Sequence, residues 1–474
     1  MKTIAMLSRS LLQGKMRLVH QAALTVLICA VAPTAWAQRT PGEPEKAQQT
    51  PAGTTATRPL PAVAQIGPAR ELKFAEYTWF HFGAQVQLWF KAAQDRIKQP
   101  DGSEGSYAFD FYCRRCRFFT AGSVVKDVFF FLLFESSNTG KGNPDGTKAA
   151  TTPQLLDAFG WVKFVQWFWL SGGQILMPLT RNGLQPTTTY VSIDNANVDT
   201  TPIGQGNSFV VRDLGFQANG FFADNHIEYR LGLWQGTRQA QVPGVQSASH
   251  NGPRFIAMVS ANLWDPETGF VNGGHYYGTR KVLGVMGNFD TQVLRTDSPA
   301  AGQQAPVGVG SDKNAYYGVS GAAFINYPLD GTPNPNGGDE IVGLLQFGYY
   351  DGGFRGTNVN PINFGSYPLV LKQTNFLGEV GYYNHGLHFS IFSKFEVRKI
   401  SEDYDLAFRQ SPPAAFPFAP SQWWAAGGIK YYLAFPSAFM NFAIQYERVN
   451  NTDAPGGEQR GTNNITFQMQ TLLF

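Results

Sequence analysis

The densest group of reactive side chains is the run Cys113-Arg114-Arg115-Cys116-Arg117. A Cys-x-x-Cys pair is typical of a redox pair or of half a metal site. In a regular β-strand, however, residues three apart point to opposite faces, about 10 Å apart, which is too far for a disulfide bond. The sequence also offers no second pair of metal ligands. We therefore expect two separately packed thiols and no metal.

Patterns of covalent catalysis are missing from the sequence. It contains no glycine-rich phosphate loop, no nucleophile elbow and no His-x-x-x-His pair on a plausible helix, and its seven histidines are scattered. The acids of Asp265-Pro266-Glu267 and Asp339-Glu340 could hold a cation in a turn, but solvated turn acids are the better interpretation. We expect neither an enzyme nor a cofactor-binding protein, although a hydrolase remains an alternative.

The elements that must position these residues are β-strands. Between Glu76 and Ala92, the apolar Phe82 and Val86 fall on one face of an extended chain while Gln85 falls on the other. The same alternation recurs along the whole sequence. The predicted strands are Glu76–Ala92, Tyr107–Phe119, Lys126–Ser137, Phe159–Trp169, Gly172–Leu179, Ser208–Ala218, Asn225–Gly236, Arg254–Leu263, Tyr276–Asn288, Ala315–Asn326, Glu340–Tyr350, Thr374–Tyr383, Leu387–Lys399, Gln422–Ala434, Phe439–Val449 and Asn463–Phe474, which makes sixteen.

The connections between these strands alternate in length. Those after odd-numbered strands are long and polar, whereas most of those after even-numbered strands are short turns, which is the pattern of a barrel that crosses a membrane. Connections around Asp265–Gly274 and Pro328–Asp339 are longer than this rule predicts. The predicted short turns include Ala121-Gly122-Ser123, Leu170-Ser171-Gly172, Asn384-His385-Gly386 and Phe435-Pro436-Ser437.

Composition agrees with a wall that faces lipid on one side. Charged residues are only 15% of the chain and aromatic residues are 14%, and aromatic pairs such as Trp423-Trp424 crowd the strand ends. The strands are also longer than the 5 or 6 residues common in a soluble β-sandwich. No apolar run in the body of the chain is long enough for a membrane helix. We predict an all-β fold: a transmembrane antiparallel β-barrel of sixteen strands with both termini periplasmic.

The amino-terminal residues are predicted to be a signal peptide. Basic residues precede the apolar run Ala22–Ala32 and the small-x-small site Ala35-Trp36-Ala37, so cleavage is expected near Ala37/Gln38. The expected organisation is a signal peptide over 1–37, a disordered periplasmic linker over 38–75 and an outer-membrane barrel over 76–474. The signal peptide holds four of the 37 Lys and Arg and none of the 34 Asp and Glu, so the mature chain has 33 basic and 34 acidic residues.

The last predicted strand is expected to close the barrel against the first one. Its apolar Phe467 and Met469 alternate with Gln468 and Gln470, but Leu472 shares the parity of the glutamines. A β-bulge near Thr471-Leu472 would restore the apolar face.

The polar face of each predicted strand should line a wet interior that carries both signs of charge. Arg115 and Arg117 share a face, and an arginine at mid-depth in lipid costs roughly 2–4 kcal/mol, so this pair should face inward and Arg114 should lie near the periplasmic headgroups. The connection Thr180–Asn207 is long enough to fold back and narrow the interior, although an outward surface loop remains an alternative. The pore-lining candidates are Gln85, Gln87, Lys91, Arg115, Arg117, Arg181, Arg230, Lys394, Arg398 and Lys430, and each could instead be an electrostatic brace between strands.

Several of these motifs resemble the phosphate-selective porin family, porins O and P, of Gram-negative outer membranes. Arg114, Arg115 and Arg117 resemble that family's arginine run in its second strand, with Cys116 where a small residue is usual. Gly173-Gln174, Pro178 and Arg181 resemble its segment before the third loop. Arg212-Asp213-Leu214-Gly215, followed by Tyr229-Arg230-Leu231-Gly232 and Gly236, resembles a hairpin of the family, with Gln235 replacing the usual Asn.

The resemblance covers about Tyr107–Gly236 and the closing strand. It implies a sixteen-stranded barrel in the cell outer membrane, a homotrimer, contact with membrane lipid, and passive diffusion of small hydrophilic solutes, with anions such as phosphate favoured. Nothing in it implies a nucleic-acid partner. The alternatives are a general or carbohydrate-preferring porin, and a barrel that acts as a sheath for a partner protein.

Overall fold

The computed structural model describes residues 71–143, 147–200, 211–236, 252–294, 314–351, 372–400, 421–433, 440–451 and 461–473. All of them belong to one compact unit, Pro59–Phe474. The predicted signal peptide with its cleavage site, the linker up to residue 70, and Phe474 lie outside the described residues.

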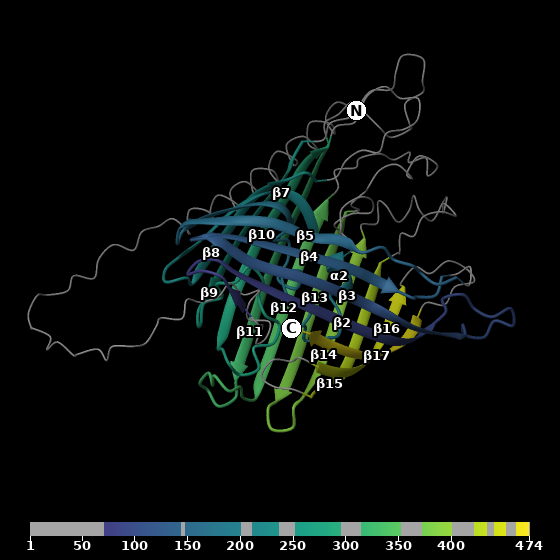
Figure 1. Ribbon diagram of the computed structural model, residues 1–474. Helices are drawn as coiled ribbons and strands as arrows, with labels where there is room; N and C mark the ends of the chain where they lie inside the picture. The colour runs from purple at the N-terminus through teal and green to yellow at the C-terminus, as the bar shows by residue number, and fades with distance from the viewer. Residues whose placement is uncertain are drawn as a thin grey trace, which may run out of the picture. The chain divides into compact units, whose positions relative to one another are not determined.

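The described chain is built almost entirely from β-strands (Figure 1). Within these ranges, no helix is long and apolar enough to cross a membrane. The strands are β1 (Glu71–Lys73), β2 (Trp79–Gln94), β3 (Tyr107–Val125), β4 (Val128–Thr139), β5 (Gln154–Val165), β6 (Phe168–Leu176), β7 (Arg212–Phe222), β8 (Ile227–Trp234), β9 (Arg254–Asn262), β10 (Val282–Leu294), β11 (Asn314–Pro328), β12 (Glu340–Asp351), β13 (Gln373–Asn384), β14 (Phe389–Ile400), β15 (Gln422–Tyr432), β16 (Met440–Asn451) and β17 (Gly461–Leu473), and a single helical turn, α2, spans Asn197–Thr200.

Strands β2 to β17 form a closed barrel of sixteen antiparallel strands, which confirms the predicted fold class. Each strand pairs with the next one along the chain, and β17 returns to pair with β2, from Asn464 opposite Ala93 to Leu473 opposite Ala84. The short β1, which falls in the predicted linker, pairs with the start of β2 just beyond the end of β17. Closure satisfies the hydrogen-bonding groups that an open sheet leaves at its edges.

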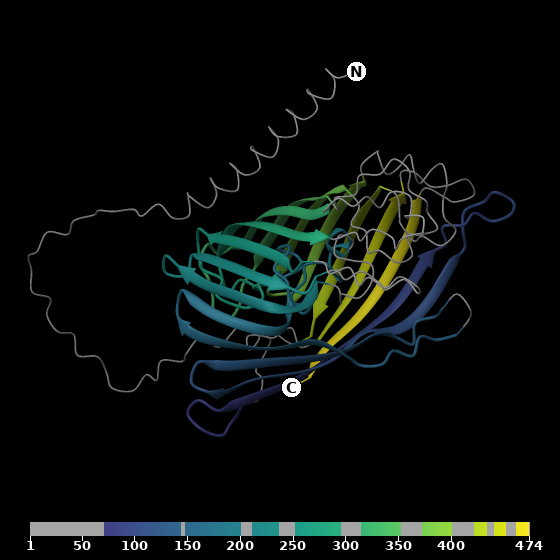
Figure 2. The same ribbon diagram turned by 90° about the horizontal axis from the view of Figure 1, so that it is seen from above.

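The connections alternate between the two ends of the barrel, as Figure 2 shows from above. At one end they are long, such as 177–211 between β6 and β7. At the other end they are as short as 126–127 between β3 and β4 and 166–167 between β5 and β6. Because the strand number is even, β2 begins and β17 ends at this short-connection end.

Two of the predicted turns are wrong, because the strands run further than the sequence pattern indicates. Ala121-Gly122-Ser123 lies inside β3, and the chain turns at Lys126-Asp127, where Asp127 adopts a φ of 61°. Leu170-Ser171-Gly172 lies inside β6, which pairs with β7 across all three residues. Glycine and serine are typical of turns, yet here they pair within the sheet. The predicted turn at Phe435-Pro436-Ser437 lies outside the described residues.

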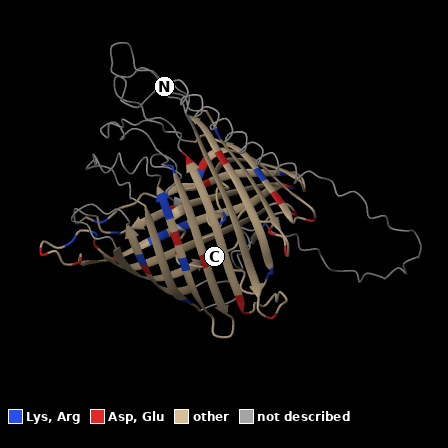
Figure 3. Cartoon of the chain, turned by 180° about the vertical axis from the view of Figure 1, so that it is seen from behind, with Lys and Arg blue, Asp and Glu red and all other residues tan. Residues whose placement is uncertain are grey.

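Side chains alternate between the two faces of the barrel wall. In β2, Phe82 is 53% exposed on the outer face while Gln87 is fully buried on the inner face. Charged residues are few along the strands (Figure 3). The expected bulge near Thr471-Leu472 is not formed: β17 keeps its register with β2, and Leu472 is buried on the inner face with Gln470. The inner face of this strand therefore ends in an apolar side chain.

Strand β3 contains a bulge that changes the direction of its reactive side chains. Arg115 pairs with Gln87 and Cys113 pairs with Leu88, so Arg114 is an extra residue between them. The extra residue puts Cys113 and Cys116 on the same outer face, where they form a disulfide bond with their Cα atoms 6.3 Å apart. The expectation of two separate thiols is wrong because it assumed a regular strand.

Candidate functional site

The described part of the connection between β6 and β7 folds back inside the barrel. Residues 177–199 of this connection, which we call the inserted loop, are almost all buried. The Nζ of Lys430 donates to the carbonyl oxygens of Tyr190 and Ser192, at 2.5 and 2.7 Å. The carboxylate of Glu379 accepts from the amide of Ser192 at 3.0 Å. Side chains of the wall thus hold the backbone of the loop from within the lumen.

Further anchors hold the end of the inserted loop near α2. The carboxylate of Glu396 accepts from the Val198 amide at 3.0 Å and is paired with Lys394, also at 3.0 Å. Gln346 donates to Asp199 at 2.7 Å and accepts from the amide of Asn182 at 3.0 Å. These contacts use both signs of charge on β14 and a neutral amide side chain on β12.

The arginine run of β3 meets the same loop at a single carboxylate. Arg114 donates to Asp194 through Nε at 3.2 Å and Nη2 at 3.0 Å, and Arg115 donates to the other oxygen of Asp194. Burial alone would raise the pKa of the Asp194 carboxyl, but the two guanidinium groups hold it well below its usual range. The prediction that Arg114 lies near the headgroups is wrong, because the bulge turns it into the lumen beside Arg115.

Arg117 continues this row of positive charge along the wall. It pairs with Glu135 of β4, and its Nη1 donates to the hydroxyl of Thr187 in the inserted loop at 2.9 Å. Further along the wall, Arg212 pairs with Asp157 at 3.0 Å. Each arginine therefore has an acidic partner in the structure.

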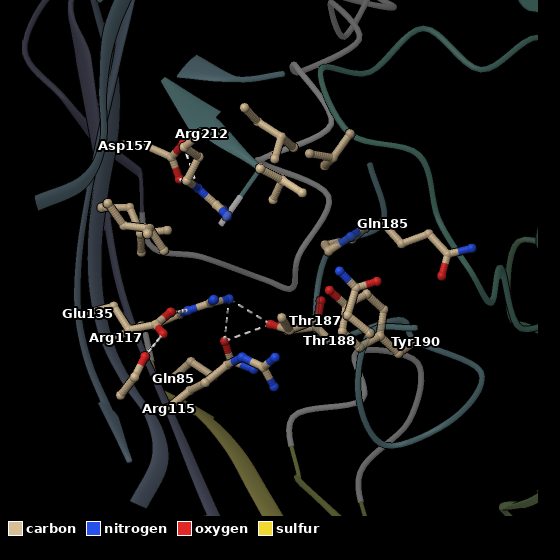
Figure 4. Close-up of a pocket in the computed structure, with 18 of the residues that line it drawn as sticks. Gln85, Arg115, Arg117, Glu135, Asp157, Gln185, Thr187, Thr188, Tyr190 and Arg212 are labelled. Atoms are coloured by element: carbon tan, nitrogen blue, oxygen red, sulfur yellow. Dashed lines mark hydrogen bonds and ion pairs between the residues drawn. The ribbon is translucent and has the colours of Figure 1, made fainter. Parts of the chain in front are cut away.

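These groups border a cavity of about 630 Å³ between the inserted loop and strands β2 to β7, which we call the main cavity (Figure 4). Its charged lining consists of the guanidinium groups of Arg114, Arg115, Arg117 and Arg212 and the carboxylates of Glu135, Asp157 and Asp194. The lining thus carries one more positive than negative charge. Phe119, Phe131 and Phe270 form part of its apolar surface.

A second segment enters the barrel from the opposite end. Residues 263–281, which connect β9 to β10, reach the inserted loop, where the amide of Asn272 donates to the carbonyl of Leu184 at 3.1 Å. The predicted strand Tyr276–Asn288 is displaced by this segment, and β10 begins only at Val282. Glu267 and Glu340 are 3% and 0% exposed, so the interpretation of these residues as solvated turn acids is wrong. Glu267 pairs with Arg181, and Glu340 pairs with His275.

All ten pore-lining candidates lie on the inner side of the barrel, but only some border the main cavity. Gln85, Arg115 and Arg117 do. Gln87 accepts from Arg115, and Lys91 follows it on the inner face of β2. The others lie elsewhere in the interior: Arg181 and Arg230 contact the second segment, Lys394 and Lys430 hold the inserted loop, and Arg398 donates to Gln422 and stacks on Trp424.

Several residues of the cavity were not predicted. Asp157 of β5 pairs with Arg212 of β7, and Glu135 of β4 pairs with Arg117 of β3, and no local sequence pattern joins the partners of either pair. Arg114 was placed on the wrong face because nothing in the sequence marks the bulge. Asp194 lies in the long connection Thr180–Asn207, but its pairing with Arg114 and Arg115 depends on how deeply the loop folds back.

Comparisons with known proteins agree on the fold. No family model matches the sequence, and no curated protein does. Among solved structures, OprB of Pseudomonas putida in its high-pH form is similar with a TM-score of 0.54 and 10% sequence identity, over 83% of this chain and 94% of that one. OmpF of Salmonella typhi in complex with daunomycin aligns with a TM-score of 0.48 and 11% identity, over 85% of this chain and 100% of that one. The chain therefore has the sixteen-stranded barrel fold that is found in Gram-negative outer-membrane porins.

Proposed function

We propose that this protein is an outer-membrane porin through which small hydrophilic solutes diffuse passively. The observation that carries the proposal is the contrast between the two faces of a closed barrel. The outer face exposes large apolar side chains such as Phe82, Phe118 and Leu345, whereas charged and amide side chains face the interior. An apolar exterior suits lipid and a polar interior suits water.

The inserted loop is the proposed constriction, and the row of arginines opposite it is the proposed charge filter. Selectivity in such pores comes from charged side chains that line a narrow section. The main cavity has four guanidinium groups against three carboxylates, so we propose a mild preference for anions, with phosphate as the candidate solute. Because each arginine already has an acidic partner, the preference should be modest.

A general or carbohydrate-preferring porin is the second candidate. Phe119 and Phe131 lie in the same cavity as Gln85 and the arginine–carboxylate pairs. Aromatic rings next to paired charged groups can accommodate a neutral polyhydroxylated ring, because the rings cover its apolar face and the paired groups bond its hydroxyls. This candidate predicts no difference between anions and cations of equal size.

We further propose a homotrimer with both ends of the chain on the periplasmic side, after removal of a signal peptide near Ala37/Gln38. The even strand number and the long connections at one end of the barrel support this orientation. We propose no catalytic role. Analytical ultracentrifugation in detergent, together with amino-terminal sequencing of the membrane-extracted protein, tests the trimer and the cleavage site.

The experiment that tests the function is reconstitution of the folded protein in a planar bilayer. A porin gives stepwise conductance increases, and a reversal potential under a KCl gradient reports the charge preference. Phosphate added to one side should reduce the chloride current if anions bind near the arginines. A current that responds to a neutral sugar and not to phosphate would favour the second candidate.

A further inference from the structure

The connection at residues 263–281, here called the inner segment, belongs to the end of the barrel where most connections are short. It does not extend away from the rim but folds inward, and Asn272 and His275 are each 1% exposed. A buried loop is unusual because its backbone groups need partners that water would otherwise supply. The inner segment finds these partners inside the barrel.

One acidic and one basic side chain of the wall hold the inner segment in place. The carboxylate of Glu340 accepts from the backbone amides of Tyr276 and Gly278, at 3.1 and 3.0 Å, and from Nδ1 of His275 at 2.9 Å. Arg230 donates to the carbonyl oxygens of Phe270 and Gly269, at 2.8 and 3.1 Å. Fully buried charge-assisted hydrogen bonds of this kind fix geometry.

The inner segment also bonds directly to the inserted loop. Besides the contact of Asn272, the amide of His275 donates to the carbonyl of Thr189 at 2.9 Å, and the amide of Gly274 donates to the hydroxyl of the same threonine at 3.1 Å. Arg181 of the inserted loop pairs with Glu267 at 2.8 Å. The two segments enter from opposite ends and meet as one hydrogen-bonded unit within the lumen.

The side chain of Phe270 borders two cavities of the barrel interior. Its ring stacks on Phe159 of the wall with centroids 4.6 Å apart, and the guanidinium group of Arg230 lies 5.5 Å from its centroid. It borders the main cavity of about 630 Å³ on one side and a small cavity of about 20 Å³ on the other. A space of that size holds about one water molecule.

We propose that the inner segment forms a second constriction, and that Phe270 is the residue that sets its width. In this arrangement the inserted loop and arginines select by charge on the long-connection side, and the Phe159–Phe270 contact selects by size towards the short-connection side. A hydrophilic solute that crosses this step must displace the Phe270 ring, because the space beyond the ring accommodates only a water-sized group. The inference rests on the proposed porin function.

The test compares Phe270→Ala with Phe119→Ala in planar bilayers, with wild type as reference. Phe119 borders the main cavity but not the small one. Removing the Phe119 ring therefore enlarges the main cavity and leaves the Phe159–Phe270 contact closed. Since the narrowest section dominates the resistance of a pore, Phe270→Ala should raise single-channel conductance at least about twofold and Phe119→Ala should change it little. Heat-modifiable migration in electrophoresis confirms that each barrel is folded.

The possible outcomes separate the two proposals. Wild-type channels with an unchanged Phe270→Ala conductance would overturn the second constriction and leave the porin function standing. A folded wild type and variants without any conductance would overturn the porin function. If Phe270→Ala fails to fold, Phe270→Cys replaces it: a charged methanethiosulfonate reagent should then cut the current, because the native cysteines of the barrel are joined in a disulfide. An unmodified current would count against the proposal.

Discussion

Replacing Asp194 by Asn should loosen the inserted loop. This carboxylate is the point where Arg114 and Arg115 both contact the loop, and it also accepts from the amide of Asn195 at 2.9 Å. Asn keeps the shape and one acceptor oxygen but removes the charge that balances the two guanidinium groups. The loop then keeps its other anchors, including Lys430 and Glu396.

The structure sets the size of the effect. Removing one partner of a fully buried ion pair costs about 3–5 kcal/mol, and removing one from an exposed pair costs below about 1 kcal/mol. The side chains of Asp194 and Arg114 are each 23% exposed and that of Arg115 is 6% exposed, so this pair lies between the two limits. We expect a loss of about 2 kcal/mol, which raises the population of displaced loop by about 30-fold.

Limited proteolysis of the inserted loop measures this population, because cleavage follows the open fraction when reclosing is fast. Asp194→Asn should be cleaved between residues 180 and 200 up to about 30-fold faster than wild type, and its channels should show more frequent conductance substates. Asp110→Asn is the matched control, since Asp110 lies on β3 with Arg114 and Arg115 but accepts from the amide of Gly142 and not from these arginines. Equal cleavage rates and equal channel noise in wild type and Asp194→Asn would refute the proposed clamp.

Three further predictions follow from other contacts. Joint replacement of Cys113 and Cys116 by Ser should let Arg114 leave Asp194 and increase channel noise, whereas noise identical to wild type would show that the bulge persists without the disulfide. Burial raises the pKa of Asp199 to about 7, above the value near 4 in an unfolded chain. The inserted loop should therefore lose stability as pH rises from about 4 to about 7, and its stability should stay level above pH 7. A proteolysis rate that does not change with pH in wild type, or that still changes with pH in Asp199→Asn, would contradict this prediction. Lys430→Met removes the ammonium group that donates to the carbonyls of both Tyr190 and Ser192, and it should also speed cleavage of the loop, while the surface variant Lys399→Met should not.

The strands were largely predictable because alternation records which side chains face lipid. In β14, for example, the inward Lys394, Glu396 and Arg398 alternate with outward residues such as Phe395, and a shift by one residue would put these three charges in lipid. The bulge at Arg114 was not predictable, because it adds a residue whose polarity equals that of its neighbour. Once it is known, the same sequence explains both the disulfide and the paired arginines.

The inner segment escaped prediction for a different reason. The aromatic pair Tyr276-Tyr277 is typical of a strand end, and such a pattern does not record burial inside a lumen. Glu340 and Arg230 bind backbone atoms of this segment, and such contacts join groups that are far apart in the sequence. The length of the connection 263–281 is evident from the sequence, but its direction depends on partners that the closed barrel brings near.

The proposed function requires a water-filled pore with a slightly positive filter beside the inserted loop. Single-channel recording in a planar bilayer under a KCl gradient measures both properties. We predict stepwise conductance with a reversal potential on the chloride side, which moves towards zero in Arg117→Gln. A folded barrel that gives no conductance steps, or channels that prefer potassium, would contradict the account.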